Sequence, residues 1–277
     1  MRIADTALLR CPTTGSPLRW QGTNLELMLA DGSLTSSDGS QVWPVVDGLP
    51  QLCREAEVGA VDLRMRHIHD RLPRAHRPLL RLALPLLQGG GSEGALQQAT
   101  REALHLDHLG PGARVLEVGV GEGGNLPWLV KALPAETELW GLDLSEVLLR
   151  RCRERWASHP FREQARLLLA DAHRLPFADG SFDRVFHLGG LGRFQDPARV
   201  LAELVRITAP GGFAVVIGKR LDPREPAAPP VAAAFRLLTL WEPEVPFSSL
   251  GTPPGAASVE EQQVSRFFAS LTIRKPA

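Results

Sequence analysis

Three carboxylates and one glycine-rich segment are the residues in this chain whose types and spacing could do chemistry together. The segment from Val115 to Asn125 reads VLEVGVGEGGN, so an apolar run leads directly into glycines. Glycine lets a ligand approach the backbone closely there, because a side chain would hold the ligand away. Glu117 precedes the glycines, Asp143 closes the apolar run LWGLD, and Asp171 follows the run RLLLA. Carboxylates at such positions accept hydrogen bonds from ribose hydroxyls, so the set predicts a nucleotide-type pocket.

Alternating strands and helices must bring these acids together. Strand-like runs cover 114–119, 138–142, 166–170, 182–187 and 212–218, and helix-like runs cover 126–132, 146–156 and 197–208. This alternation predicts an α/β fold of the Rossmann-like, doubly wound type with a mostly parallel sheet. Ligands of such folds bind beyond the carboxyl ends of the strands, where we expect all three acids to lie.

The glycine pattern alone does not identify the ligand, because it fits two different motifs. Gly119, Gly121 and Gly124 fit the spacing GxGxxG, which dinucleotide-binding enzymes use. Gly123 equally completes the pattern ExGxGxG that starts at Glu117. An NAD-dependent oxidoreductase therefore stays as an alternative at this point.

Five elements in order resemble the class I S-adenosylmethionine-dependent methyltransferases over about residues 95–220, most closely the small-molecule type that includes quinone-biosynthesis enzymes. They are Glu117 with the glycines, Asp143, the turn ADA at 170–172 with LPF at 175–177, SFDRV at 181–185, and RITAPGG at 206–212. The resemblance implies a seven-stranded sheet whose last strand is antiparallel. It also implies S-adenosylmethionine as the co-substrate.

The resemblance assigns a role to each part of the pocket. Glu117 and the glycines would hold the methionine part, Asp143 the ribose, and Asp171 with Ala172 the adenine. The cofactor-binding residues implied in this way are Glu117, Gly119, Val120, Gly121, Gly123, Asn125, Asp143, Leu144, Asp171, Ala172, His187 and Leu188.

Methyl transfer in this family is a direct displacement, for which positioning and desolvation supply much of the acceleration. The resemblance therefore implies neither a metal nor a covalent residue. His187 ends the fourth strand-like run, beside the expected methyl group, and its ordinary pKa of about 6.5 suits a general base. A pocket wall is the alternative role for His187. The Asn-Pro-Pro-Tyr type signature is absent, which disfavours methylation of adenine N6 or glutamine amides.

The chain before the methyltransferase-like region divides into two parts. Residues 1–56 contain turn signals between short apolar runs and predict a small β-rich domain. The runs 8–18 and 42–50 resemble the zinc-ribbon-like domain of tRNA-methyltransferase activator proteins, but Thr14 stands where a second cysteine would be, so we expect no zinc. Residues 57–94 predict a helical connection that covers the active site and a glycine-rich linker, and 95–277 the methyltransferase domain.

The C-terminal part predicts a helix around 231–241 and a final antiparallel pair of strands. We expect the acceptor pocket between this part, helices within 61–88 and the loop after His187. Its lining cannot be derived from motifs, because acceptor pockets are built from variable loops.

Composition excludes several classes of protein. Lysine plus arginine and aspartate plus glutamate both number 31, so no overall charge attracts nucleic acid or membrane. Three cysteines without a CxxC pair fit neither a disulfide framework nor a complete zinc site, and no apolar stretch is long enough for a membrane span. We therefore expect a cytoplasmic protein.

The leading hypothesis is methyl transfer to an oxygen, carbon, nitrogen or sulfur atom of a small organic molecule, in specialised metabolism. An rRNA or tRNA methyltransferase is the second, raised by the N-terminal resemblance and by arginines crowded within 64–81. The charge of residues 1–60 argues against RNA as the substrate, because this part holds four arginines and seven acids. The third hypothesis is a non-catalytic S-adenosylmethionine-binding partner protein. Separately, the sequence leaves open whether the protein is a monomer or a homodimer.

Overall fold

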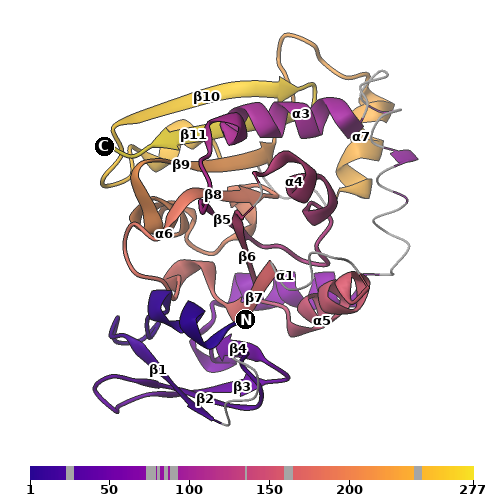
Figure 1. Cartoon of the computed structure of the whole chain (residues 1–277). Coiled ribbons are helices and arrows are strands. Elements are labelled where there is room, and N and C mark those ends of the chain that lie inside the picture. The colour runs from indigo at the N-terminus through magenta and orange to yellow at the C-terminus, as the bar shows by residue number, and fades with distance from the viewer. Residues whose placement is uncertain are drawn as a thin grey trace.

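The computed structural model describes residues 1–22, 28–72, 79, 82–83, 87, 93–134, 136–158, 165–239 and 245–277. In this part of the chain a single 11-stranded sheet has the order β1-β2-β3-β4-β7-β6-β5-β8-β9-β11-β10 (Figure 1). The strands are β1 (Leu18–Gly22), β2 (Gly32–Ser36), β3 (Val42–Val46), β4 (Leu49–Leu52), β5 (Arg114–Val118), β6 (Glu138–Asp143), β7 (Ala165–Ala170), β8 (Phe182–Leu188), β9 (Thr208–Lys219), β10 (Ser258–Ser265) and β11 (Phe268–Arg274). The helices are α1 (Ala60–Arg71), α3 (Glu93–Ala103), α4 (Leu126–Ala132), α5 (Glu146–Trp156), α6 (Pro197–Ile207) and α7 (Pro229–Leu238).

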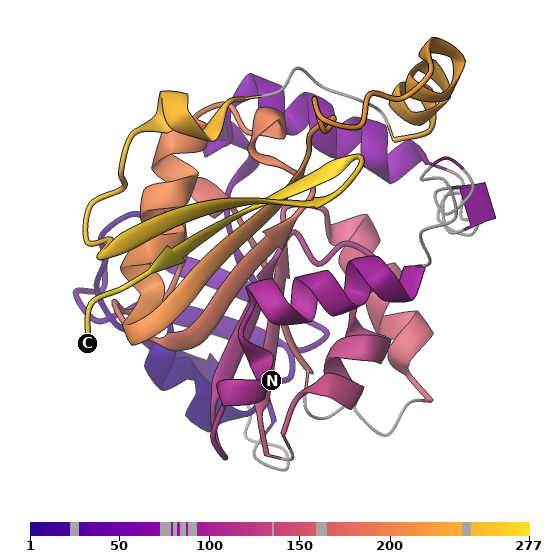
Figure 2. The ribbon, with the colours of Figure 1, turned by 90° about the horizontal axis from the view of Figure 1, so that it is seen from above.

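The sheet from β7 to β10 confirms the predicted fold class. Strands β7, β6, β5, β8 and β9 pair in parallel, whereas β11 pairs antiparallel with both β9 and β10. Helix α6 covers one face, and α3, α4 and α5 cover the other (Figure 2). Because both faces are covered, the central strands are largely apolar, with Val115 and Leu116 of β5 fully buried.

The N-terminal strands extend this sheet. Strand β4 pairs in parallel with β7, through Gln51 with Leu169 and Leu52 with Ala170. The buried side chain of Trp43 belongs to the same hydrophobic core as Trp140 of β6. Residues 1–56 are therefore β-rich as expected, but they share a sheet and a core with the rest of the protein. The division of the chain at 56 and 94 into separate domains stays a prediction.

Several expected elements have clear outcomes. The spacing that predicts a helix after residue 60 corresponds to α1, and the final antiparallel pair is β10 with β11. The linker was expected to run to Gly94, but that residue lies in α3, which begins at Glu93. Residues 23–27 of the expected β-rich part lie outside the described residues, as does most of the range 73–92 within the expected helical connection and linker.

Candidate functional site

A loop of glycines, residues 119–125, connects β5 with α4 and forms the centre of the site. Gly119, Gly121 and Gly123 have φ angles of 77°, 54° and 70°, a left-handed region that strongly favours glycine. The Gly119 and Val120 amides both donate to the Leu142 carbonyl, at 2.8 and 3.0 Å, which fastens this glycine loop to β6. The structure thus holds the loop in a single shape at the end of the sheet.

The underside of the glycine loop packs tightly against α5. A Cβ atom on Gly123 would lie 2.7 Å from both Cys152 Sγ and Trp156 Nε1. Real Cβ atoms essentially never come so close, so either the loop or α5 would have to move. Glycine at position 123 is therefore required by packing as well as by backbone conformation.

Glu117 lies on β5 just before the glycine loop and is 1% exposed. Its Oε1 accepts a hydrogen bond of 2.5 Å from Nδ2 of Asn125, the residue before α4. The Asn125 Oδ1 atom in turn accepts from Trp128 Nε1 at 3.4 Å. Glu117 and Asn125, both predicted from the resemblance as cofactor-binding residues, are thus in direct contact across the loop.

Asp143 ends the neighbouring strand, β6, and holds the other side of the loop. Its Oδ2 accepts from the Gly121 amide at 2.8 Å and its Oδ1 from the Ser145 amide at 2.8 Å. A carboxylate oxygen has two lone pairs and can accept more than one hydrogen bond. This geometry fits the predicted ribose contact, and Leu144 lies in the same turn.

Asp171 follows the next strand, β7, and forms a pair with His173. Asp171 Oδ1 accepts from the His173 amide at 2.9 Å and from His173 Nδ1 at 2.8 Å, and neither bond uses Oδ2. Burial raises the pKa of Asp171, but the hydrogen bonds from His173 outweigh it and the net pKa is lowered. Asp171 therefore stays a carboxylate, and Ala172 is buried beside it.

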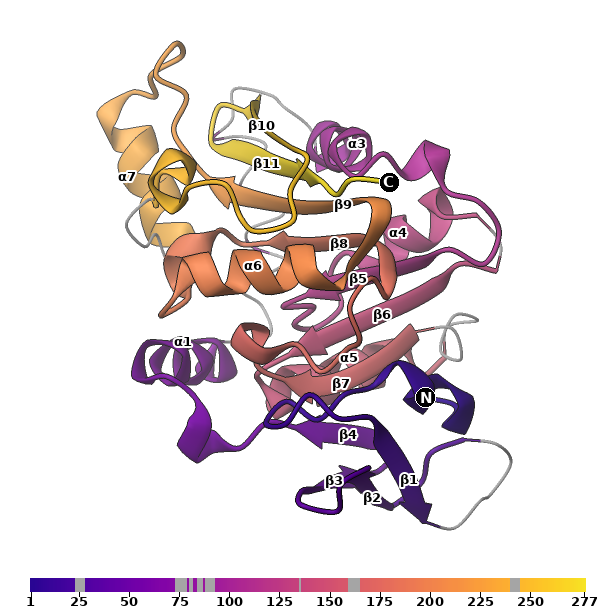
Figure 3. The same ribbon diagram turned by 90° about the vertical axis from the view of Figure 1, so that its left-hand side faces the viewer.

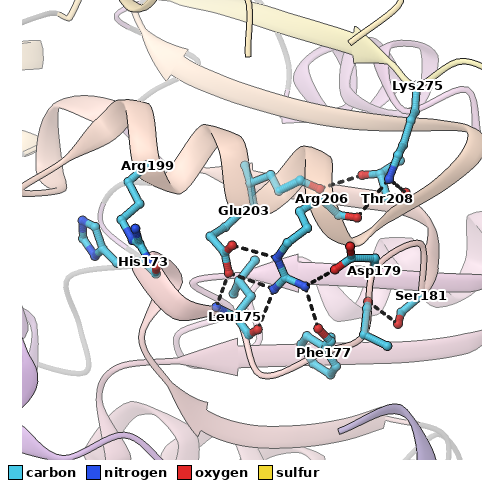
Figure 4. Close-up of polar contacts among 12 residues, drawn as sticks. His173, Leu175, Phe177, Asp179, Ser181, Arg199, Glu203, Arg206, Thr208 and Lys275 are labelled. Carbon is cyan, nitrogen blue, oxygen red and sulfur yellow. Dashed lines mark hydrogen bonds and ion pairs between the residues drawn. The ribbon is translucent and has the colours of Figure 1, made fainter. Parts of the chain in front are cut away.

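The loop after β7 is fastened by Arg206, the first residue of the RITAPGG segment, to which the motif analysis gave no role of its own (Figure 4). Arg206 of α6 donates to the carbonyls of Leu175 and Phe177 at 2.8 Å and to Asp179 Oδ1 at 2.7 Å. It also contacts both oxygens of Glu203, at 2.7 and 2.9 Å, while Glu203 accepts from the Leu175 amide at 2.8 Å. Its guanidinium thus fixes the segment that begins at Asp171. The spacing of Glu203 and Arg206 on one helix was the available signal.

His187 lies on β8 directly opposite Val118 of β5. His187 as a whole is 7% exposed, and its Nδ1 donates to the Val118 carbonyl at 2.8 Å. Burial lowers the pKa of His187, against the opposing effect of that carbonyl. The ring is therefore neutral near pH 7, with the acceptor lone pair on Nε2. Its role as a base stays a prediction, as do the individual ligand contacts of the other site residues.

Helix α1 docks beside these strand ends, on the same side as α7 (Figure 3). Its Asp70 carboxylate accepts from the Ser145 hydroxyl, and Arg151 of α5 donates to the Asp70 carbonyl at 3.4 Å. Arg151 also pairs with Glu122 of the glycine loop at 3.0 Å. Arg151 thus connects α1 with the glycine loop. Sequence reasoning missed these residues, because such contacts join segments far apart in the chain.

A cavity of about 140 Å³ lies at the ends of β8 and β9. The residues lining it are Gly189, Gly190, Leu191, Gly192, Arg193, Gly218, Lys219, Arg220, Val245, Pro246 and Phe247. The loop after His187 and residues 245–247 of the C-terminal part line it. In contrast to the expectation, no described residue within 61–88 lines it. We refer to this space below as the acceptor cavity, after the role that is proposed for it under Proposed function.

The structure also bears on the remaining features raised by the sequence, namely metal ligands, the cysteines, the arginines within 64–81 and membrane spans. Within the described residues no cluster of three or more histidine, cysteine or acidic side chains could hold a metal ion. Burial raises the pKa of the Cys53 thiol to about 12. Of the arginines within 64–81, Arg66 pairs with Glu55 at 2.6 Å, whereas 74, 77 and 81 lie outside the described part. No helix in the described ranges is long and apolar enough to cross a membrane.

Comparison with known proteins resolves the choice between cofactors. Residues 116–216 match the family model described as a methyltransferase domain. A phosphatidylethanolamine N-methyltransferase of Cereibacter sphaeroides is 30% identical over 167 residues, which cover 60% of this chain and 79% of that protein. The chain belongs to the class I S-adenosylmethionine-dependent methyltransferases. The glycine loop of this methyltransferase is therefore part of an S-adenosylmethionine-binding fold.

Two further similar proteins match a smaller share of their own length or resemble this methyltransferase only in fold. A demethylmenaquinone methyltransferase of Desulfitobacterium hafniense is 30% identical over 129 residues, 47% of this chain and 49% of that protein. The match thus spans about half the length of such curated relatives. A Haemonchus contortus phosphoethanolamine N-methyltransferase, solved with S-adenosyl-L-methionine, has a TM-score of 0.58 at 14% identity, covering 85% of this chain and 64% of that one. At that identity the likeness shows the fold alone.

Proposed function

We propose that the protein transfers the methyl group of S-adenosylmethionine to an oxygen, carbon, nitrogen or sulfur atom of a small organic molecule, in specialised metabolism. The observation that carries this proposal is the acceptor cavity. It is small, and Gly189, which lines it, directly follows the strand that carries His187. A Cβ atom on Gly189 would lie 3.2 Å from His187 Nε2, so that nitrogen faces the wall of the cavity.

The chain's own residues would bind and orient the cofactor. Glu117, Asn125 and the glycine loop would hold the methionine part, Asp143 the ribose, and Asp171 the adenine, with Ala172 beside it. When bound, S-adenosylmethionine supplies an activated methyl group on a sulfonium. The protein's contribution is then to align acceptor and methyl group and to exclude water from between them.

His187 would remove the proton that the acceptor loses. Its neutral ring donates through Nδ1 to Val118 and so directs the basic Nε2 away from that carbonyl. A lowered pKa keeps the ring neutral below pH 6.5 and makes Nε2 a weak base. Such a base suits an acceptor whose proton is already acidic.

The first experiment is calorimetric titration of the purified protein with S-adenosylhomocysteine, with NAD as a parallel control. Micromolar or tighter binding of S-adenosylhomocysteine alone supports the proposed cofactor site. Methyl-labelled S-adenosylmethionine is then offered with a panel of small hydroxyl, amine, thiol and carbon-acid acceptors, and separately with rRNA and tRNA. Labelling of RNA alone would contradict the proposal, and so would tight cofactor binding with no labelled product but with a stable protein partner.

A further inference from the structure

We propose that His173 is a positioning residue of the cofactor site, which holds the Asp171 carboxylate so that its second oxygen, Oδ2, accepts from the 6-amino group of adenine. The inference rests on the proposed function and adds the group that the nucleobase must offer, an exocyclic N–H donor. It predicts that the site distinguishes adenine from purines that lack this amino group.

The orientation of the Asp171 carboxylate depends on one neighbouring residue. Asp171 Oδ1 accepts from the His173 amide at 2.9 Å and from His173 Nδ1 at 2.8 Å. A carboxylate with a single hydrogen bond can still turn, whereas two donors on the same oxygen give the other oxygen a fixed direction. Neither bond uses Oδ2, and the Asp171 side chain is 14% exposed. The arrangement therefore leaves Oδ2 as the oxygen for a ligand.

Both ring nitrogens of His173 have a partner, which fixes where the ring carries its proton. Nε2 accepts from the Asp196 amide at 3.1 Å, so Nδ1 is the donor to Asp171. Burial lowers the pKa of His173, but the hydrogen bond and charge of Asp171 outweigh it, and the net pKa is raised. Nδ1 carries a proton in this neutral tautomer and in the cation alike. The donor to Asp171 is thus present on both sides of the pKa of His173.

The surroundings of His173 keep its ring in place. The ring of Phe194 meets it edge to face, with the centroids 5.9 Å apart and the planes at 81°. Arg199 of α6 donates to the His173 carbonyl at 2.8 Å, and Figure 4 shows the two residues side by side. The His173 side chain is only 12% exposed. Its hydrogen bond to Asp171 is therefore part of a fixed structure.

A second carboxylate beside the ring shows that Asp171 receives this donor specifically. Asp62 of α1 is 6% exposed, and its Oδ2 has no hydrogen-bond partner among the described residues. That oxygen lies 3.9 Å from His173 Nδ1, too far for a hydrogen bond. A donor that served stability alone would go to the more deeply buried acid, because an unpaired buried acceptor is costly. The ring instead donates to the acid at the end of β7.

The chemistry of the two groups matches. Burial raises the pKa of Asp171, but the hydrogen bonds from His173 outweigh it, and the net pKa is lowered. Asp171 is therefore a carboxylate, which only accepts hydrogen bonds. The 6-amino group of adenine is a donor, and a purine with hydrogen at that position would leave Oδ2 unpaired in a desolvated site. Sites that hydrogen-bond one group of a ligand reject analogues without it for this reason.

The experiment compares S-adenosylhomocysteine with its 6-deamino analogue, in which hydrogen replaces the amino group and the ring nitrogens are unchanged. Both are titrated into the full chain by calorimetry, and the ratio of the two affinities measures recognition of the amino group. We expect the wild-type protein to bind S-adenosylhomocysteine at least tenfold more tightly than the analogue. A variant that is merely damaged would weaken both ligands and keep the ratio.

Three substitutions of His173 separate its two nitrogens. His173→Phe keeps a ring without either nitrogen, and His173→Gln places an amide near Nε2 but no donor near Nδ1. Both should reduce the ratio to less than threefold. His173→Asn places an amide nitrogen near Nδ1 and should keep a ratio of at least fivefold. His108→Phe is the matched control, because His108 is exposed and lies in the turn before β5, and its ratio should equal that of the wild type.

Nitrogen NMR of the unliganded protein tests the same geometry without relying on ligand affinity. On the alkaline side of its titration, His173 should carry its proton on Nδ1. Its signal is assigned by its absence from His173→Asn. A proton on Nε2 would overturn the inference.

The affinity ratio can also overturn it. Equal binding of the two ligands by the wild type would do so, as would an unchanged ratio in His173→Phe and His173→Gln. A ratio in His173→Asn no higher than in His173→Gln would remove the role of Nδ1. If His173→Phe does not fold, the Asn and Gln variants and the NMR spectrum still decide. Failure of the wild type to bind S-adenosylhomocysteine at all would instead count against the proposed function.

Discussion

Replacing Gly123 by alanine tests whether packing against α5 shapes the cofactor loop. The φ angle of 70° costs a residue with a Cβ atom about 1–2 kcal/mol. The new methyl group would also lie 2.7 Å from Cys152 Sγ and Trp156 Nε1, and overpacking of this kind costs about 1–3 kcal/mol. The two contributions together predict a loss of about 2–5 kcal/mol in the free energy of unfolding.

Gly112→Ala is the matched control for this variant. Gly112 has a φ angle of 74°, but a Cβ atom there would meet nothing within 4 Å. Only the backbone cost of about 1–2 kcal/mol applies to it. The difference between the two variants therefore isolates the packing of the glycine loop on α5.

Urea unfolding followed by tryptophan fluorescence measures both losses, and calorimetry with S-adenosylhomocysteine measures whether the displaced loop still binds. We expect Gly123→Ala to lose more stability than Gly112→Ala and to bind at least tenfold more weakly. Adding Cys152→Ala to Gly123→Ala should restore part of the loss, because the Sγ atom is removed. Equal losses in the two glycine variants, with no recovery in the double variant, would refute the packing argument.

Three further substitutions test the site. Asp143→Ala should weaken the binding of S-adenosylhomocysteine at least tenfold in calorimetry, since hydrogen bonds to charged groups contribute about 1.5–3 kcal/mol. An unchanged affinity would contradict the ribose contact. His187→Asn should abolish turnover in the labelling assay and keep cofactor affinity, and normal turnover would make His187 a pocket wall. The pKa of His187 is lower in the folded protein than in the unfolded chain. As the pH falls below about 6.5, the unfolded chain therefore binds this proton while the folded protein does not. The free energy of unfolding then falls by up to about 1.4 kcal/mol per pH unit until the pH reaches the folded pKa. Urea unfolding at pH 7.5, 6.5 and 5.5 should show a shallower acid loss in His187→Asn than in wild type, and identical slopes would argue against a buried neutral ring. Arg206→Met should lower the free energy of unfolding by at least about 2 kcal/mol, because two backbone carbonyls lose their donor, and a smaller loss in urea would contradict its anchoring role.

Local patterns predicted the central elements of the fold well. Helix α5 has the predicted bounds, and Ser145, whose hydroxyl accepts from the Leu148 amide, caps its first turn. Strand β9 was expected to begin at Gly212 but begins at Thr208. The reason is a register shift against β8, where Phe182 pairs with Thr208 and Arg184 with Phe213. The strand thereby absorbs residues with a turn-like sequence.

The site was predictable where it follows strand order and unpredictable where it depends on tertiary contacts. Glu117, Asp143 and Asp171 belong to the ends of three neighbouring strands, as the alternation of elements implies. The spacing of Glu203 and Arg206 indicates only their own ion pair. The backbone carbonyls from other segments that Arg151 and Arg206 contact leave no pattern in the sequence. Docking of α1 likewise depends on pairs such as Asp70 with Ser145, which lie 75 residues apart in the chain.

The pairing of β4 with β7 affects the order in which the newly made chain can reach its final structure. Gln51 pairs with Leu169, so a strand made early waits for one made 118 residues later. At roughly 5–20 residues per second of translation, that wait lasts about 6–24 s. During this interval β4 has no partner on one edge, although it can already pair with β3 on the other. The sheet edge formed by β4 is thus completed only after β7 has been made, and until then β4 can pair only with its neighbouring hairpin strand.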